Sequence, residues 1–171
     1  VAEALKARPG MLPICECYFD NVLETDQMAP LRAFPEGTVL QFTINRRYWS
    51  RVQQELDAQK VQDLPPHPIL IRTHMGSQWG DVIGPERHKL VAQDFAALTQ
   101  QVARLGLAGV TVFGEVSPAQ TVHEINYLSV ARFADNPDLT WDEFVAGTLA
   151  PLLGGEQAAR TYLAVLEMEK V

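Results

Sequence analysis

The sequence predicts an α/β fold in which a parallel sheet of about four strands is followed by an all-helical end. Short apolar, β-branched segments alternate with longer segments of helical periodicity, which is the pattern of successive βα units. Strands that alternate with helices form parallel sheets covered by those helices. The last third of the chain carries two Thr-x-x-Glu helix starts, which indicates that the alternation has ended there.

The expected strands are short and end in polar residues. They cover Leu12–Phe19, Thr38–Ile44, Ile69–Thr73 and Gly109–Phe113. The first is an apolar run that favours a buried strand. In the second, Gln41 and Thr43 alternate with Leu40 and Phe42, which predicts a sheet or barrel with polar groups on its inner face.

Helices are expected between the strands and throughout the tail. They cover residues 2–8, Thr25–Ala33, Tyr48–Lys60, Pro85–Leu105, a segment that begins at Thr121 and stops at Asn136-Pro137, a segment from Thr140 to Leu153, and residues 156–169. Thr121 and Thr140 each stand three residues before a glutamate, the spacing of a capping box. Gly106 is the expected cap of the longest helix, and Gly154-Gly155 ends the helix that Thr140 begins.

Composition limits the classes of partner. With 171 residues, of which 47% are hydrophobic and 20% charged, the chain can bury a real core. Its net charge of −7 and the lack of a basic run argue against a nucleic-acid partner. Because no apolar stretch approaches 18 residues, we expect no membrane span. The chain opens on Val1 and not on Met, which is compatible with a lost upstream portion or signal peptide.

The two cysteines, Cys15 and Cys17, stand one residue apart on the first expected strand. Such close neighbours form a disulfide only with distortion, so we interpret them as free, buried thiols. Free thiols favour a reducing compartment, the cytoplasm.

Three carboxylates are the catalytic candidates. Glu115 comes directly after the fourth strand, and ligands of α/β proteins gather at the carboxyl ends of strands. Glu16 lies on the first strand among apolar neighbours, where a carboxylate is costly unless it is paired or functional. Asp20 lies just past that strand. The alternatives are a structural ion pair for Glu16 and a turn or helix-capping role for Asp20.

Four residues are the substrate-binding candidates: Asn45, Arg72, His74 and Trp79. Asn45 and His74 follow or end strands and suit hydrogen bonding to hydroxyl groups. Arg72 suits a hydroxyl or a substrate carboxylate, and Trp79 suits stacking on a sugar face. Local capping, a structural histidine and ordinary loop packing are the alternatives for Asn45, His74 and Trp79.

Carboxylates, aromatic side chains and neutral hydrogen-bonding groups around one depression suit a polyhydroxylated ligand. Glycoside hydrolysis needs two carboxyl groups about 5–9.5 Å apart. The chain has no nucleophile-elbow, P-loop or dinucleotide-binding motif. The four histidines lack zinc-site spacing, so no metal or cofactor is expected. A metal held by Glu115, His74 and Glu16 is the alternative.

The tail segment EINYLSVARFADNPDLTWDEF resembles the segment that closes the barrel and starts the C-terminal helices in (β/α)₈-barrel glycoside hydrolases of the α-glucuronidase type. The resemblance covers about 35 residues. It implies a TIM barrel that acts on a glycosidic bond with carboxylate catalysis, so a carbohydrate is the expected substrate. Because four strands are half of such a barrel, we expect residues 1–120 to be its C-terminal half and residues 121–171 a helical extension.

The function expected from these observations is a carbohydrate-active hydrolase. One alternative is a non-catalytic sugar-binding or scaffold domain, and another is a metal-assisted barrel enzyme of a different class. An open half-barrel exposes strand edges, so we also expect either a missing N-terminal barrel half or a homo-oligomer.

Overall fold

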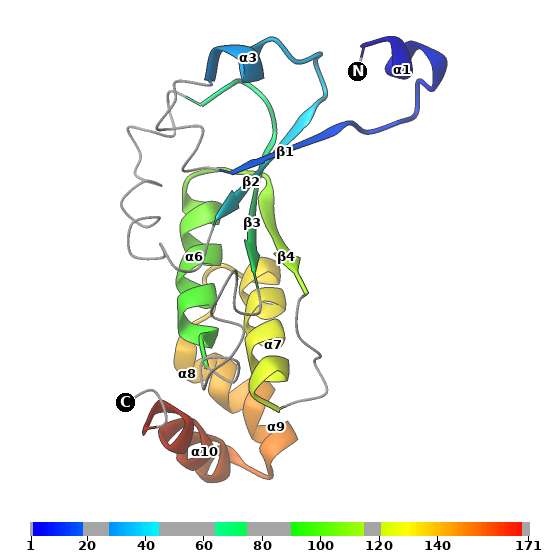
Figure 1. Ribbon diagram of the computed structural model, residues 1–171. Helices are drawn as coiled ribbons and strands as arrows, with labels where there is room; N and C mark the ends of the chain where they lie inside the picture. The colour runs from blue at the N-terminus through cyan, green and yellow to red at the C-terminus, as the bar shows by residue number, and fades with distance from the viewer. Residues whose placement is uncertain (1, 19–27, 45–63, 75–89, 115–120, 169–171) are drawn as a thin grey trace.

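The computed structural model describes residues 2–18, 28–44, 64–74, 90–114 and 121–168. Its elements are α1 (Ala2–Ala7), β1 (Ile14–Tyr18), α3 (Met28–Arg32), β2 (Val39–Ile44), β3 (Ile69–His74), α6 (Ala92–Arg104), β4 (Gly109–Phe113), α7 (Thr121–Asp135), α8 (Trp141–Phe144), the π-helical η3 (Val145–Leu149), α9 (Ala150–Leu153) and α10 (Glu156–Met168) (Figure 1). The predicted α/β class is confirmed. The expected helix Tyr48–Lys60 and the first part of the expected helix Pro85–Leu105 lie outside the described residues.

The described strands form a parallel sheet in sequence order, β1-β2-β3-β4. The register places Glu16 opposite Gln41, and it places Arg72 between Thr43 on one side and Thr111 on the other. The predicted parallel sheet is therefore confirmed. Each strand lies beside the strand that precedes it in the chain, as short βα units produce.

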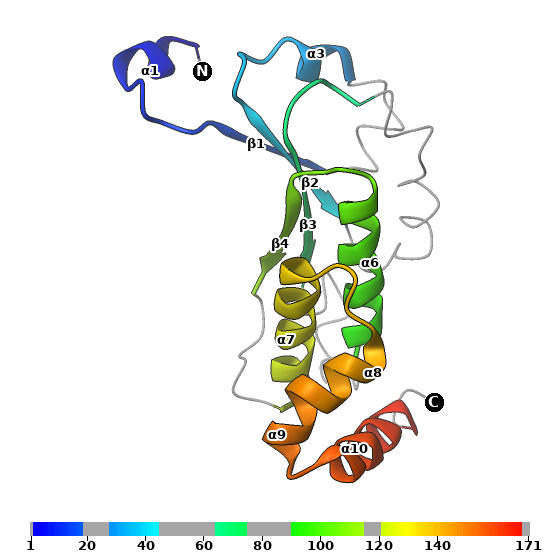
Figure 2. The same ribbon diagram turned by 180° about the vertical axis from the view of Figure 1, so that it is seen from behind.

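One face of the sheet is apolar and carries the core. Leu40, Phe42 and Ile71 are fully buried there, and Leu98 and Val102 of α6 pack against them. Val130 of α7 extends the same layer toward β4. Both helices therefore cover this face (Figures 1 and 2). Full burial of one such side chain stabilises the fold by about 1.5–3 kcal/mol.

The opposite side of the sheet carries polar side chains, and we call it the polar face. Successive side chains along a strand point to opposite faces, so the residues between the apolar ones lie on this side. The register brings together on it Glu16 of β1, Gln41 and Thr43 of β2, Arg72 and His74 of β3, and Thr111 and Phe113 of β4. Alternation in β2 predicted this division into a polar and an apolar side, and the structure extends it across the sheet.

The prediction that the first strand is buried is wrong. β1 pairs with β2 alone among the described strands, and Ile14 and Tyr18 on it are 56% and 38% exposed. An apolar run does not distinguish an edge strand from a central strand, because strands in both positions can have such a sequence. Cys15 and Cys17 are free, as predicted, but half-buried, since they pack on the rim of the core.

Hydrogen bonds from α7 fix the first turn of α6. The Asn126 side-chain oxygen accepts from the backbone N–H of Val91 at 3.0 Å, and the Ser129 hydroxyl donates to the carbonyl of Ala92 at 2.5 Å. All four residues are buried. The Asn126 bond therefore satisfies an N–H at the start of α6 that has no partner within the helix, and the Ser129 bond satisfies its own buried hydroxyl. At its other end α6 has Leu105 as its C-cap, and Gly106, the predicted cap, follows it with a φ of 67°.

The helical end continues from α7 without a strand. The Thr140 capping box is present as predicted, and Gly154 ends α9 in the left-handed conformation with a φ of 84°. Between them α8, η3 and α9 form one continuous helix, whose π turn was not predicted. α7 begins at Thr121 itself, so the residue that would cap it lies outside the described part. None of the described helices is long and apolar enough to cross a membrane.

Candidate functional site

A salt bridge between Glu16 and Arg72 lies at the centre of the polar face. A guanidinium N–H of Arg72 on β3 donates to the Glu16 carboxylate on β1. The two strands are not neighbours, because β2 lies between them. The Arg72 side chain is 17% exposed and that of Glu16 is 41% exposed, so the pair is partly shielded from water.

The intervening strand supplies a second donor to the same carboxylate. The Thr43 hydroxyl, itself buried, donates to the Glu16 oxygen that Arg72 also contacts, at 2.8 Å. A second bond also spans non-neighbouring strands: the Thr111 hydroxyl of β4 donates to the side-chain oxygen of Gln41 on β2 at 3.0 Å. These bonds join side chains of all four strands into one polar layer.

An aromatic ring completes the site on β4. The Arg72 guanidinium carbon lies 4.4 Å from the centre of the Phe113 ring, a cation–π contact. The ring of His74 meets the same phenyl ring edge-on, with ring centres 5.4 Å apart. Phe113 therefore links the ion pair to the histidine near the carboxyl end of β3.

The arrangement offers distinct chemical groups at fixed positions. Glu16 is an acceptor oriented by two donors, so it suits charge stabilisation or nucleophilic attack better than proton donation. Arg72 has further N–H groups beyond the one used on Glu16, and these suit a hydroxyl or carboxylate oxygen. The half-exposed Phe113 adds an apolar surface beside them.

The structure unites part of the predicted site. Glu16 and Arg72 are in direct contact, and His74 joins them through Phe113. The ion pair that was the alternative interpretation of Glu16 is therefore present. The other predicted site residues lie outside the described residues: Asp20, Asn45, Trp79 and Glu115.

Sequence reasoning did not assign Thr43, Thr111 or Phe113 to the site. Thr43 was identified only as a polar position in an alternating strand. The alternation of β4 places Thr111 and Phe113 on one side, but their proximity to Arg72 depends on the register between β3 and β4, which no local pattern specifies.

Cys15 and Cys17 lie on the apolar side of the sheet, opposite the polar face, and their thiols are less acidic than usual. Burial raises the pKa of Cys17 to about 12, and the neighbouring Cys15 and Glu16 add to the shift. Burial also raises the pKa of Cys15. Both side chains are therefore protonated near neutral pH and behave as small apolar groups.

In the described ranges, no group of three or more His, Cys, Asp or Glu side chains is arranged to hold a metal ion. Comparison of the chain with protein families, with curated proteins and with solved structures finds no match.

Proposed function

We propose that the chain is part of a carbohydrate-active hydrolase that cleaves a glycosidic bond by carboxylate chemistry, with its substrate bound at the polar face and the carboxyl ends of the strands. The observation that carries this proposal is the oriented carboxylate of Glu16, which accepts from both Thr43 and Arg72 beside an exposed aromatic ring.

The sheet is proposed to be half of a (β/α)₈ barrel. Its order is sequential and all its described strands are parallel, whereas a doubly wound sheet reverses its strand order and has helices on both faces. Here α6 and α7 cover the same face (Figure 2). A polar inner side opposite an outer helical layer is the arrangement of a barrel wall near its mouth.

The proposed roles follow from position and from chemistry. Glu16 stabilises developing positive charge on the sugar or acts as the nucleophile, and Arg72 and His74 bind sugar hydroxyls. Glu115, which directly follows Gly114 after β4, is the proposed second carboxylate and proton donor. Asp20, Asn45 and Trp79 keep their predicted roles as a catalytic partner, a hydroxyl binder and a stacking platform.

Hydrolysis of a panel of aryl glycosides by the wild-type protein and three variants tests this proposal. Glu115→Gln and Glu16→Gln should each lower kcat by about 10²-fold or more, because an amide cannot transfer a proton or attack as a carboxylate. Glu36→Gln is the matched control, since Glu36 is an exposed carboxylate in the turn before β2. This change should leave activity unaltered.

Other outcomes would select an alternative. Undiminished activity in Glu115→Gln and Glu16→Gln would remove both residues from the chemistry. Inactivity of the wild type on every glycoside, with sugar binding retained, would select the non-catalytic sugar-binding domain. A loss of activity on treatment with a chelator would select a metal-assisted enzyme.

A further inference from the structure

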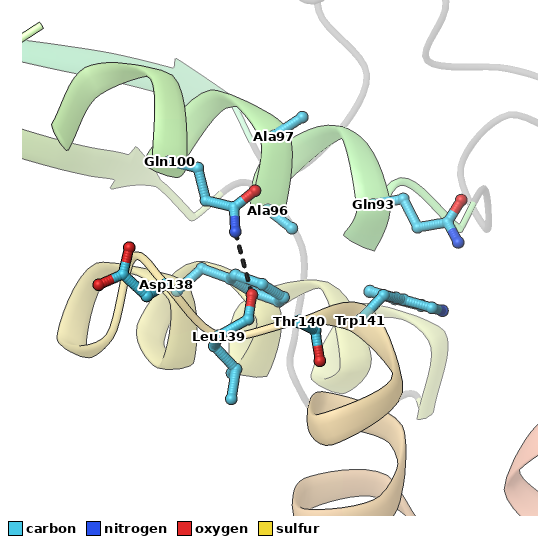
Figure 3. Close-up of a pocket in the computed structure, with 9 residues that line it drawn as sticks. Gln93, Ala96, Ala97, Gln100, Asp138, Leu139, Thr140 and Trp141 are labelled. Carbon is cyan, nitrogen blue, oxygen red and sulfur yellow. Dashed lines mark hydrogen bonds between the residues drawn. The ribbon is translucent and has the colours of Figure 1, made fainter. Parts of the chain in front are cut away.

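A concave surface lies on the helical layer, away from the polar face. It is a pocket of about 300 Å³ between α6 and the loop that joins α7 to α8. Its walls include Gln93, Ala96, Ala97 and Gln100 of α6 and, on the loop side, Asp138 and Trp141 (Figure 3). The volume is at the lower end of the range for small-molecule sites, which suits one sugar ring better than a long chain.

The pocket has a fixed aromatic wall. The Trp141 ring stacks on Phe133 with ring centres 6.5 Å apart and contacts Phe144 at 5.1 Å. Figure 3 shows the indole edge-on, with a face directed toward α6. Ala96 and Ala97 on that helix leave the space open, because neither has atoms beyond Cβ. A stacking surface held rigid by other rings loses little entropy when a ligand binds.

The loop wall is also held in place. The Gln100 side-chain amide donates to the carbonyl of Pro137 at 2.9 Å and to that of Leu139 at 3.0 Å, and Figure 3 shows the second of these bonds. Both of its N–H groups are used by these bonds, so Gln100 can contact a ligand only through its side-chain oxygen, as an acceptor. The loop is therefore fixed to α6 before any ligand arrives.

Further polar groups at the pocket are available to a ligand. Within the described part of the chain, the Gln93 amide, the Asp138 carboxylate and the Trp141 indole N–H make no hydrogen bond with another side chain. Figure 3 places Gln93 beside Trp141 and Asp138 beyond Gln100, so these groups flank the pocket at both ends. A donor and several acceptors around an aromatic surface match the alternating hydroxyls and C–H faces of a sugar.

The charges of the lining select among ligand classes. Among the described residues that line the pocket there is no Lys or Arg and one carboxylate, which disfavours an anionic ligand. Asp138 lies at the opposite end from Trp141, so the carboxylate does not complete an aromatic cage for an ammonium group (Figure 3). A neutral polyhydroxylated ring fits both observations.

We infer that this pocket is an accessory binding site for a neutral sugar ring, separate from the polar face. The choice of a sugar as ligand rests on the proposed function. The pocket geometry and its lining do not depend on that proposal.

The test is a titration of the isotope-labelled protein with neutral methyl pyranosides and disaccharides, followed by NMR. The indole N–H signal of Trp141, assigned with a Trp141→Phe variant, should shift with saturation in the millimolar range. Ala97→Leu, which enlarges a side chain at the wall of the pocket, should abolish the shift. Gln93→Ala should weaken binding by about threefold to tenfold, the effect of one hydrogen bond. Ala103→Leu, an exposed change on α6 outside the lining, is the matched control and should bind as wild type does.

The outcomes separate this inference from the proposed function. If Ala97→Leu loses sugar binding at Trp141 and keeps wild-type hydrolysis of aryl glycosides, both stand. If the protein hydrolyses no glycoside and Trp141 still responds to sugars, only the hydrolase proposal fails. An unshifted Trp141 signal at 100 mM sugar, equal binding by Ala97→Leu, or a response to alkylammonium ions instead of sugars would overturn the inference.

Discussion

Arg72 on β3 reaches over β2 to bind Glu16 on β1, and the Thr43 hydroxyl of β2 donates to the same carboxylate beneath it. Strands β1 and β3 lie two strand spacings apart, about 10 Å. The long Arg72 side chain crosses that gap and connects the edge strand to β3. The pair is thus both a candidate binding group and a structural tie.

We predict that this tie is worth more than an exposed ion pair. A double-mutant cycle with Glu16→Gln and Arg72→Met, measured by urea unfolding, should give a coupling free energy of about 1 kcal/mol. The control is the cycle of Asp142→Asn with Arg160→Met, whose partners lie 2.9 Å apart and are 78% and 44% exposed. That cycle should give less than about 0.5 kcal/mol. Equal coupling energies would show that the Glu16 pair adds no particular stability.

The sequence predicted the fold well wherever the signal was local. Strand Gly109–Phe113 was placed with both ends correct, because a Gly stands at its start and β-branched residues fill it. The capping box formed by Thr140 and Glu143 was likewise predicted from the spacing of these two residues alone. The sequence does not predict the π turn Val145–Leu149, because its small and apolar residues are equally compatible with an ordinary α-helix.

The Thr140 cap should contribute measurably to the stability of the helical end. Its hydroxyl accepts from the Glu143 backbone N–H at 3.2 Å, and the Glu143 carboxylate accepts from the Thr140 backbone N–H at 2.8 Å. Thr140→Ala should therefore cost about 1 kcal/mol in thermal or urea unfolding. The control is Thr161→Ala on α10, whose hydroxyl donates only to the Gln157 carbonyl one turn earlier. This exposed change should stay within about 0.5 kcal/mol of wild type.

The cap should also depend on pH. Hydrogen bonds from the Thr140 backbone N–H and hydroxyl lower the pKa of Glu143 below its ordinary value of 4.5. A carboxyl group whose pKa is lower in the folded state stabilises the fold above its unfolded pKa and loses that contribution as pH falls through the folded value. The stability difference between wild type and Thr140→Ala should thus be full at pH 6 and narrow below pH 4.5. A difference that stays constant from pH 6 to pH 3 would contradict this prediction.

Cys17 should be almost unreactive toward alkylating reagents. With its pKa raised to about 12, roughly one thiol in 10⁴ is ionised at pH 8, against about one in ten at the ordinary value of 9.0. In a Cys15→Ser protein, alkylation of Cys17 followed by mass spectrometry should be at least 10²-fold slower in buffer than in 8 M urea. Equal rates in both solutions would show that the thiol is not buried in the native protein.

The sequence indicates which polar residues could belong to the candidate site, but not which of them lie next to one another. A carboxylate among apolar neighbours is expected to be paired or functional, and Glu16 is paired with Arg72, although it lies on an exposed edge strand and not in a buried one. The identity of the partner depends on which strands are neighbours and in which register, and a one-residue slip would move Arg72 to the apolar face. Register is a property of the assembled sheet, so local sequence did not link Arg72 to Glu16 or to Phe113.

The open edges of the sheet should make the 171-residue chain associate in solution. Among the described strands, β1 pairs only with β2 and β4 only with β3, and unpaired strand edges promote association. In two copies related by a two-fold axis, β4 of each could pair in parallel with β1 of the other and close the sheet. Ile14→Lys, which places a charge at the 56% exposed Ile14 of the edge strand, should shift sedimentation velocity toward monomer.

The matched control for association is Leu152→Lys, which changes an equally exposed residue, 58% accessible, on α9 and not on the sheet. It should leave the oligomer unchanged, because a charge there does not oppose strand pairing. If Ile14→Lys and Leu152→Lys dissociated the oligomer to the same extent, general surface hydrophobicity and not the strand edge would drive association. A wild-type chain that sediments as a single monomer and unfolds cooperatively would show that the described sheet needs no partner for its edges.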